Sequence, residues 1–367
     1  MPSKNLSSSG QFLLAITICL VICGLFFVTS AGVALSQLKF HQSYYYLKNQ
    51  LWKGVVPGII LGLTAFFIPY KHWKKYSFLL LLSSAFLLLG VFIPGLGICH
   101  KGAHRWLNLG FFTIQPTEIV KLSIILYLAA WIENHQRHLK NFKEGLLPIL
   151  LVFGIIGALI LLEPDLGTLG VIALTIGLIL FLGQAKISHL LSICLLGIII
   201  IVLAIHTFPY AANRWHSFLH PTTDIQGKSY QIYQSLIALG SGGLFGRGLG
   251  KSLQKYRFLP EPVGDSIFAI IGEELGFIGT VALISLFFLF VYFCFRIAQR
   301  APDKFGYFLV SGFAVLVAVQ SLINLAAIIR IIPLTGITLP FISYGGTSLA
   351  VFLTGVGFIL NIDRHRK

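Results

Sequence analysis

Four of the chain's twelve acidic residues lie within residues 258–279, where a polar segment runs into an apolar one. They are Glu261, Asp265, Glu273 and Glu274. Carboxylates are costly next to hydrocarbon and usually mark function there. Asp265 follows Gly264 and an approach stiffened by Pro260 and Pro262, so we expect it where a loop meets a helix. At the rim of a lipid-accessible groove, partial desolvation would raise its pKa and suit it to act as a general base.

A structural role is the alternative for Asp265, because aspartate is a strong N-cap residue. Glu273 and Glu274 fall deeper in the same apolar run, where we favour hydrogen bonding within a helix bundle. Residues 240–250 are rich in glycine. They lack the strand and helix that flank a nucleotide-binding loop, so we interpret them as a tight turn packed against helices.

Cationic side chains near Asp265 could stabilise negative charge on a leaving group. Lys251 and Arg257 lead into it, and Arg105 lies in an earlier loop, where interfacial snorkelling is the alternative. Glu118 and Lys121 are three residues apart and project from one side of a helix. They either neutralise each other inside a bundle or line a path for a polar head group.

Four histidines at spacings of four residues do not complete a metal site, because no third ligand accompanies either pair. They are His100, His104, His216 and His220. We therefore expect interfacial histidines, and the identity of any metal is left open.

Composition places these residues in a membrane. The chain is 56% hydrophobic and 11% charged, against about 25% charged residues in a typical soluble protein. Ten segments approach the ~20 apolar residues that a membrane-spanning helix needs. They are residues 12–35, 54–70, 77–96, 116–132, 146–163, 168–184, 188–207, 267–295, 306–329 and 341–361. We expect an all-α, polytopic membrane protein with a single domain over residues 1–367.

The basic residues predict the orientation. With both termini in the cytoplasm, fourteen Lys and Arg residues fall in inner segments and six in the short outer loops, as the positive-inside rule requires. Residues 208–266 then form a large outer loop between spans seven and eight. Within it, residues 229–239 have the spacing of an amphipathic helix. The net charge of +15 is therefore explained by topology, and we expect no nucleic-acid partner.

Several stretches, in order along the chain, resemble the SEDS family of membrane glycosyltransferases, which includes FtsW, RodA and SpoVE. They are residues 101–110, 115–121, 163–168, 230–250, 258–279 and 339–348. The runs at 270–275 and 301–306 look more like the division subgroup, FtsW. The resemblance implies a ten-helix fold and an inverting peptidoglycan glycosyltransferase that polymerises lipid II at the outer face of the bacterial cytoplasmic membrane, in cell division.

The resemblance also implies residue roles. The family's essential aspartate matches Asp265, and its polar cavity residues match Arg105, Glu118, Lys121 and Asp165. Its late Pro- and Gly-containing motif includes Ser343 and Tyr344. With Lys251, Arg257 and Glu261, these complete the set that we expect to bind substrate. Mg²⁺ or another divalent cation could assist a pyrophosphate leaving group, and no organic cofactor is expected.

One departure from the family is visible: Val263 and Gly264 stand where it usually has His-Thr. The implied partners are lipid II, a single-span class B penicillin-binding protein and other division proteins. Two further hypotheses belong to other classes. Intramembrane charges could serve a lipid II flippase or transporter, or the chain could be a non-catalytic scaffold of the division machinery.

Overall fold

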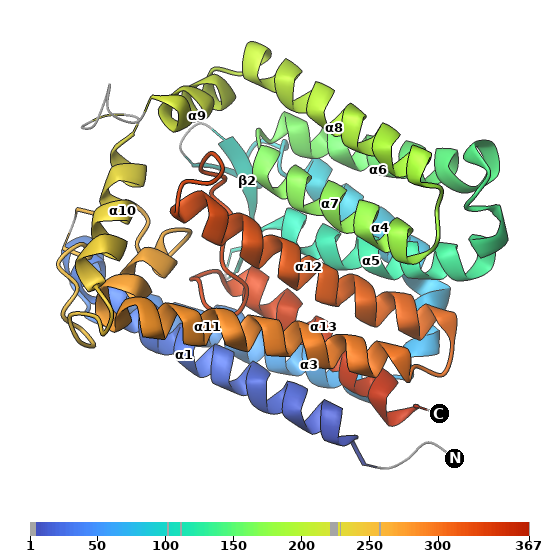
Figure 1. Cartoon of the computed structure of the whole chain (residues 1–367), viewed down its shortest axis with the longest axis horizontal. Helices are drawn as coiled ribbons and strands as arrows, with labels where there is room; N and C mark the ends of the chain where they lie inside the picture. The colour runs from blue at the N-terminus through green and yellow to red at the C-terminus, as the bar shows by residue number, and fades with distance from the viewer. Residues whose placement is uncertain are drawn as a thin grey trace.

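Long apolar helices form a bundle in which segments remote in sequence lie side by side (Figure 1). The computed structural model describes residues 5–100, 103–110, 112–220, 227, 229–256 and 258–366, and only the backbone of residues 99 and 100. The main α-helices are α1 (Ser8–Phe40), α3 (Val56–Phe67), α4 (Tyr70–Gly90), α5 (Pro116–His135), α6 (Leu147–Leu162), α7 (Leu166–Leu182), α8 (Ile187–Thr207), α9 (Pro209–Leu219), α10 (Tyr230–Gly242), α11 (Ile267–Gln299), α12 (Lys304–Ile328) and α13 (Gly346–Arg364). A short helix α2 (Tyr45–Gln50) and a π-helical turn, Leu51–Val55, run directly into α3.

Seven helical segments of the described chain are long and apolar enough to cross a membrane. They are Ser8–Phe40, Tyr45–Phe67, Phe142–Leu162, Ile187–Thr207, Ile267–Gln299, Lys304–Ile328 and Gly346–Arg364. This confirms a helical, multi-pass membrane protein. The segment Leu166–Leu182 is apolar but shorter, and α4 and α5 carry more charge. Each of the ten expected segments overlaps a helix, although their ends differ.

The last expected segment begins later than predicted. The prediction began at residue 341, whereas α13 begins at Gly346. Phe341 has a φ of 63°, a left-handed conformation that is unfavourable for a bulky residue. Residues 339–345 instead form a loop against the segment that carries Asp265.

The all-α fold class is confirmed, with a small sheet at residues 97–114 as a local exception. Three short antiparallel strands, β1 (Gly97–His100), β2 (Ala103–Asn108) and β3 (Thr113–Ile114), form a sheet in the order β1-β2-β3. These strands are too short and polar to show a clear alternation of apolar residues. Residues 208–266 also contain more helix than expected, because α9 precedes the predicted amphipathic helix, now α10. Pro209 at the first turn of α9 favours a helix start.

Helix α12 lies at the centre of the bundle and packs against α5, α7 and α11. Its most apolar stretch is largely buried, whereas that of α8 is almost fully exposed at the edge of the bundle. Residues close to the two ends of the described chain are in contact. The backbone N–H and the hydroxyl of Ser7 donate to the Asp363 carboxylate at 2.7 and 2.5 Å. Both ends therefore lie on the same side of the bundle.

The glycine-rich segment packs where α11 is interrupted at Gly276, which has φ 69° and ψ −164°. Phe277 and Ile278, just after the break, donate their N–H groups to the carbonyls of Gly243 and Leu244 at 2.9 and 3.1 Å. The glycine-rich segment thus accepts hydrogen bonds from two N–H groups that would pair within α11 if that helix were continuous. A Cβ on Gly242 would lie 2.0 Å from the Gly272 oxygen, so the close approach requires glycine there. The prediction of a packed tight turn is confirmed.

Candidate active site

Hydrogen bonds to three successive carbonyl groups fix the backbone around Asp265. The Tyr344 N–H donates to the Val263 oxygen at 2.8 Å, and the Ser343 hydroxyl donates to the Gly264 oxygen at 2.8 Å. The Asn324 amide on α12 donates to the oxygen of Asp265 itself at 2.9 Å. Two of the donors come from the loop before α13 and one from α12, so a rigid part of the bundle fixes the position of Asp265.

The side chain of Asp265 is half-buried and is held from α10. The Gln231 amide donates to both carboxylate oxygens, at 3.3 and 3.2 Å, and to the Ser266 hydroxyl at 2.9 Å. Ser266, not Asp265, is the N-cap residue of α11, and its side chain makes no capping hydrogen bond. The helix-capping alternative for Asp265 is therefore wrong, and its carboxylate is left for another task.

Arg214 on α9 acts electrostatically on Asp265. Among the described residues, its charge is the one that favours the ionised form of Asp265. The Arg214 Nη1 donates to the Leu334 oxygen at 2.7 Å, and its guanidinium carbon lies 4.3 Å from the centre of the Tyr210 ring. Arg105 from β2 approaches the same ring, at 5.9 Å. Tyr210 thus links two arginines that lie more than a hundred residues apart in the sequence.

Arg105 is fixed by the turn between α6 and α7. Its Nε donates to the Glu163 oxygen at 3.1 Å, and its Nη2 donates to the oxygen of Pro164. The carboxylates of Asp165 and Glu163 act on it electrostatically. Asp165 also begins α7, because its side chain accepts from the Thr168 N–H and hydroxyl at 3.2 and 2.8 Å. Interfacial snorkelling does not describe Arg105, whose guanidinium is bonded to the protein backbone.

Glu118 and Lys121 bind each other inside the bundle. The Lys121 ammonium lies 2.8 Å from the Glu118 Oε1 and donates to Gln320 at 2.8 Å. The side chains of Lys121 and Glu118 are only 2% and 6% exposed. Gln320 lies one helical turn from Asn324, so the pair and the Asp265 backbone are bonded to the same stretch of α12. Mutual neutralisation is the alternative that the contacts support, and substrate contact stays a prediction.

The other residues expected to bind substrate lie in different parts of the structure. Glu261 is exposed beside Asp265, and Lys251 is exposed on the segment that follows the glycines. Ser343 and Tyr344 contact the Asp265 segment as described, and the Tyr344 ring packs edge-on against Tyr46. Arg257 lies outside the described residues. Substrate binding by all of them stays a prediction.

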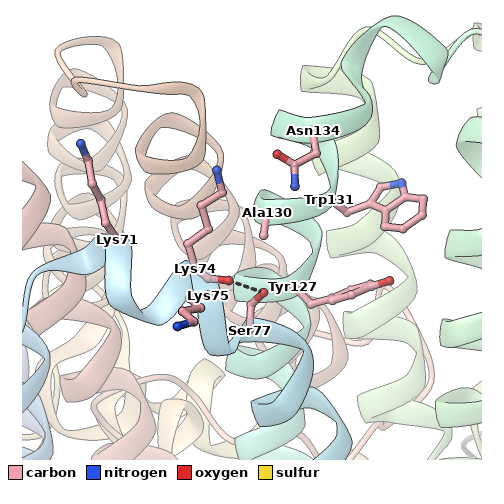
Figure 2. Close-up of a pocket in the computed structure, with 8 residues that line it drawn as sticks. All are labelled: Lys71, Lys74, Lys75, Ser77, Tyr127, Ala130, Trp131 and Asn134. Carbon is pink, nitrogen blue, oxygen red and sulfur yellow. Dashed lines mark hydrogen bonds between the residues drawn. The ribbon is translucent and has the colours of Figure 1, made fainter.

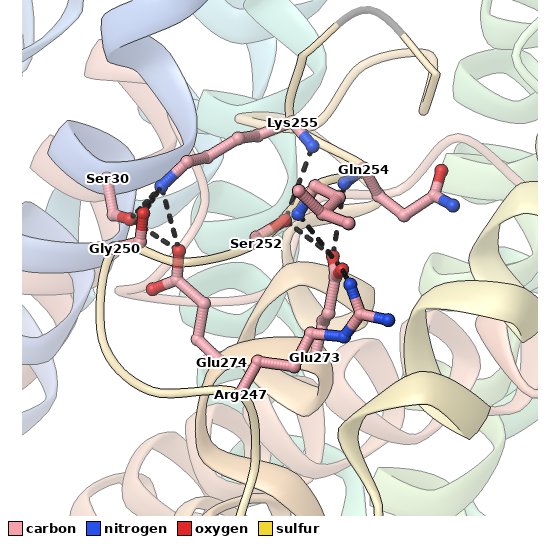
Figure 3. A network of polar contacts seen from close by, with 9 residues as sticks. Ser30, Arg247, Gly250, Ser252, Gln254, Lys255, Glu273 and Glu274 are labelled. Carbon is pink, nitrogen blue, oxygen red and sulfur yellow. Dashed lines mark hydrogen bonds and ion pairs between the residues drawn. The ribbon is translucent and has the colours of Figure 1, made fainter.

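Glu273 and Glu274 bind the segment that precedes Asp265 (Figure 3). Glu273 accepts from the Ser252 hydroxyl at 2.5 Å and lies 3.5 Å from Arg247. Glu274 pairs with Lys255 at 3.1 Å. Both glutamates are fully buried, and their bonds explain how α11 tolerates two carboxylates. The expected hydrogen bonding is confirmed, but most partners lie in the segment of residues 247–255 rather than in the bundle. From the bundle, Ser30 on α1 donates to Glu274 at 2.7 Å. Lys255, which precedes Asp265 in this segment, is already paired.

The surroundings of Asp265 favour a proton-accepting role near neutral pH. Burial raises the pKa of Asp265 to about 6, and the Glu261 carboxylate adds to the rise. The Gln231 hydrogen bond and the Arg214 charge oppose it. A carboxylate with a pKa close to the working pH is an efficient general base.

The described residues offer pairs of carboxylates for a cation but not a closed cage. No group of three His, Cys, Asp or Glu side chains is found among them. The pairs are Glu163 with Asp165, and Glu261 with Asp265. Mg²⁺ that is held partly by substrate phosphates needs only one or two protein carboxylates. A divalent cation stays a prediction, and no step is assigned to it.

Sequence reasoning missed three residues that complete the site: Arg214, Gln231 and Asn324. All three come from elements that pack around Asp265 only in the folded chain. Arg214 carried one available signal, since it is a cation among apolar and aromatic residues in the outer segment. Gln231 and Asn324 are uncharged, so nothing in their sequence surroundings indicates a role in the site.

This arrangement defines a class: multi-pass membrane proteins with a RodA-like fold. The chain is similar to the solved structure of the rod shape determining protein RodA of Thermus thermophilus, with a TM-score of 0.70, 26% identity, and coverage of 97% of this chain and 96% of that one. It is also similar to a solved chain from work on the structural coordination of polymerization and crosslinking by a peptidoglycan synthase complex. There the TM-score is 0.78, the identity 27%, and the coverage 97% and 98%.

Sequence comparison gives the family. Residues 11–367 match the FtsW, RodA and SpoVE family, described as cell cycle proteins. Stage V sporulation protein E of Bacillus subtilis strain 168 is 40% identical, covering 98% of each chain. The Probable peptidoglycan glycosyltransferase FtsW of Geobacter sp. strain M18 is 39% identical, covering 99% of each. The chain belongs to this family, the SEDS proteins, and the resemblance drawn from its motifs is confirmed.

Proposed function

We propose that this protein is a peptidoglycan glycosyltransferase that polymerises lipid II into glycan strands at the outer face of the cytoplasmic membrane. The observation that carries the proposal is the half-buried carboxylate of Asp265, fixed by three backbone hydrogen bonds and placed near Arg214. Relatives named as peptidoglycan glycosyltransferases, similar over nearly the whole chain, support the reaction class.

In the proposed reaction, a sugar 4-hydroxyl of one lipid-linked disaccharide attacks the anomeric carbon of another. Asp265 accepts the hydroxyl proton as the new glycosidic bond forms. The bond to the lipid pyrophosphate breaks, and that group leaves with the electron pair. In-line attack inverts the anomeric centre. Arg214 and Arg105, joined through Tyr210, are the cations placed to stabilise the charge that grows on the pyrophosphate.

The proposed topology has ten crossings with both termini in the cytoplasm. The contact of Ser7 with Asp363 supports an even number of crossings. The excess of basic residues in the inner segments supports the orientation. This topology places α9, α10 and Asp265 at the outer face, where lipid II presents its disaccharide for polymerisation.

Purified protein in detergent, supplied with labelled lipid II, tests the activity. Glycan strands longer than one disaccharide are the expected product. A flippase would make no polymer, because it moves the lipid without forming a glycosidic bond. A scaffold would make none until a catalytic partner was added. Failure to polymerise both alone and with a cognate transpeptidase would contradict the proposal.

The partner is proposed to be a single-span class B penicillin-binding protein, working with other division proteins. The likeness to a chain of a peptidoglycan synthase complex supports such a partner. The division-like runs at residues 270–275 and 301–306 favour a division role. We expect the gene to restore septation in cells depleted of their FtsW protein. Rescue of a mutant in stage V sporulation protein E alone would assign the chain to sporulation instead.

The pH dependence of polymerisation is expected to show an acid limb near pH 6, because Asp265 must be deprotonated to act and its pKa is about 6. Glu261→Gln removes a negative charge that raises this pKa, so the limb should move to lower pH. Arg214→Gln removes a positive charge that lowers it, so the limb should move to higher pH. The Glu261 shift should be a fraction of a unit, since that residue is exposed and screened.

Initial rates of glycan formation at low lipid II concentration measure both shifts. Glu144→Gln is the matched control, because it removes a carboxylate that pairs with His138 far from the site. The acid limb of its pH profile should lie at the same pH as that of the native chain. Shifts of the same sign in the Glu261 and Arg214 variants would remove Asp265 as the titrating base.

A further inference from the structure

A basic pocket at the opposite end of the bundle from Asp265 has no part in the proposed reaction. It has a volume of about 380 Å³ and lies between the start of α4 and the last turns of α5 (Figure 2). Three of the lining residues are lysines from α4, and two aromatic residues and an amide come from α5. The residues are Lys71, Lys74, Lys75, Tyr127, Trp131 and Asn134.

The lysines occupy a position that is unfavourable for cations. The N-terminus of a helix carries a partial positive charge and favours anions, yet the first turn of α4 has no acidic residue. Lys74 is offset by Glu133, whose Oε2 lies 2.6 Å from its ammonium. Within the described part of the chain, neither Lys71 nor Lys75 forms an ion pair, and both are exposed. The Lys75 ammonium lies 5.7 Å from the centre of the Tyr76 ring. Two lysine charges and a helix terminus thus border the pocket without an anionic partner among the described residues.

An apolar surface continues from this pocket along α4. The Phe78 ring lies 6.0 Å from that of Tyr127, which lines the pocket. Phe78 and the following Leu79 are 57% and 59% exposed. Tyr127 and Trp131 have the amphipathic rings that are typical of the membrane interface. A ligand with a negatively charged head and an apolar tail would match both parts at once.

We propose that this pocket binds the phosphodiester headgroup of an anionic phospholipid from the cytoplasmic leaflet, with Lys71 and Lys75 contacting the phosphate. The acyl chains would lie over Phe78 and Leu79. Basic pockets between membrane helices on the cytoplasmic side commonly bind such headgroups. The leaflet follows from the proposed topology, which places residues 71–75 on the inner side. The continuous apolar surface favours a lipid over a soluble phosphate compound.

The full chain in neutral detergent, titrated with phosphatidylglycerol or with phosphatidylcholine of the same acyl chains, tests the site by native mass spectrometry. The native chain should retain phosphatidylglycerol preferentially. Lys71→Gln/Lys75→Gln should weaken its binding on the order of thirtyfold, taking about 1 kcal/mol for each lysine. The control Lys140→Gln/Lys143→Gln removes the same charge from exposed positions at the same end of the bundle, and should bind as the native chain does.

Asn134→Asp is the second variant, and it decides the test if the double lysine variant does not fold. It leaves every lysine in place and adds a negative charge to the rim of the pocket, so it should also weaken phosphatidylglycerol binding. Equal binding of the two lipids would overturn the proposal. So would equal weakening in the Lys140/Lys143 control, which would indicate general surface charge. Displacement of the lipid by inorganic phosphate at similar concentrations would assign a soluble phosphate site instead.

Discussion

Purified protein carrying Asp265→Asn is expected to bind lipid II and to polymerise it about 10²–10⁴-fold more slowly than the native chain, the range that general base catalysis contributes. The amide has nearly the shape of the carboxylate but does not accept the hydroxyl proton. The three hydrogen bonds to the backbone of residues 263–265 do not involve the side chain. The Gln231 amide can still donate to the new amide oxygen. The fold should therefore survive and the loss should fall on the chemical step.

The assay separates binding from chemistry. Lipid II affinity is measured by equilibrium binding in detergent, and chain growth by electrophoresis of labelled glycan. Glu144→Gln is the matched control, because it removes an exposed carboxylate that pairs with His138 away from the site. At neutral pH its rate should stay close to native. An Asp265→Asn protein that polymerised at the native rate would end the assignment of Asp265 as the base.

Glu118→Gln is expected to destabilise the protein by about 3–5 kcal/mol, the usual cost of leaving one partner of a buried ion pair uncompensated. The Lys121 ammonium would then keep neutral acceptors, Gln320 and the new amide oxygen, but would lose the negative charge that compensates it inside the bundle. Lys121→Met should cost a similar amount, because it leaves the Glu118 carboxylate alone. The double variant Glu118→Gln/Lys121→Met removes both charges and should recover most of the loss.

Thermal unfolding in detergent measures the stability of all three variants. Glu144→Gln is again the control, since its pair with His138 is more than half exposed and should contribute no more than about 1 kcal/mol. Single variants as stable as the native chain would show that the pair does not support the fold. The activity of the double variant then tests substrate binding. Near-native polymerisation would remove Glu118 and Lys121 from the set that contacts lipid II.

The helices could be predicted because a bilayer imposes a length and an apolar character on each crossing. Segments such as 188–207 and 306–329 therefore matched α8 and α12 closely. The strands at residues 97–114 and helix α9 were missed, because short polar elements outside the apolar segments have no such constraint. Helix ends were displaced where lysines extend a helix, as in α4, or where a loop has another task, as before α13.

The site was predictable in the same uneven way. Charges in an apolar chain are expensive, so Asp265, Lys121 and the two adjacent glutamates on α11 stood out from the sequence. Glu118 was found as the partner of Lys121 by its spacing, but the partners of Asp265 did not stand out. Gln231 and Asn324 are neutral, and they meet Asp265 only because α10 and α12 pack around it. Tertiary contacts across many residues decide which polar side chain becomes a partner, and spacing along the chain does not report them.

The hydrogen bonds to the carbonyls of residues 263 and 264 have a consequence for how this segment can vary between relatives. Every residue type supplies a main-chain oxygen, so the acceptor groups survive any replacement at these two positions. Natural sequences can therefore exchange His-Thr for Val-Gly without displacing the acid that follows. Substitution at these two positions should be tolerated, whereas Ser343, whose hydroxyl donates to the Gly264 oxygen, should vary less.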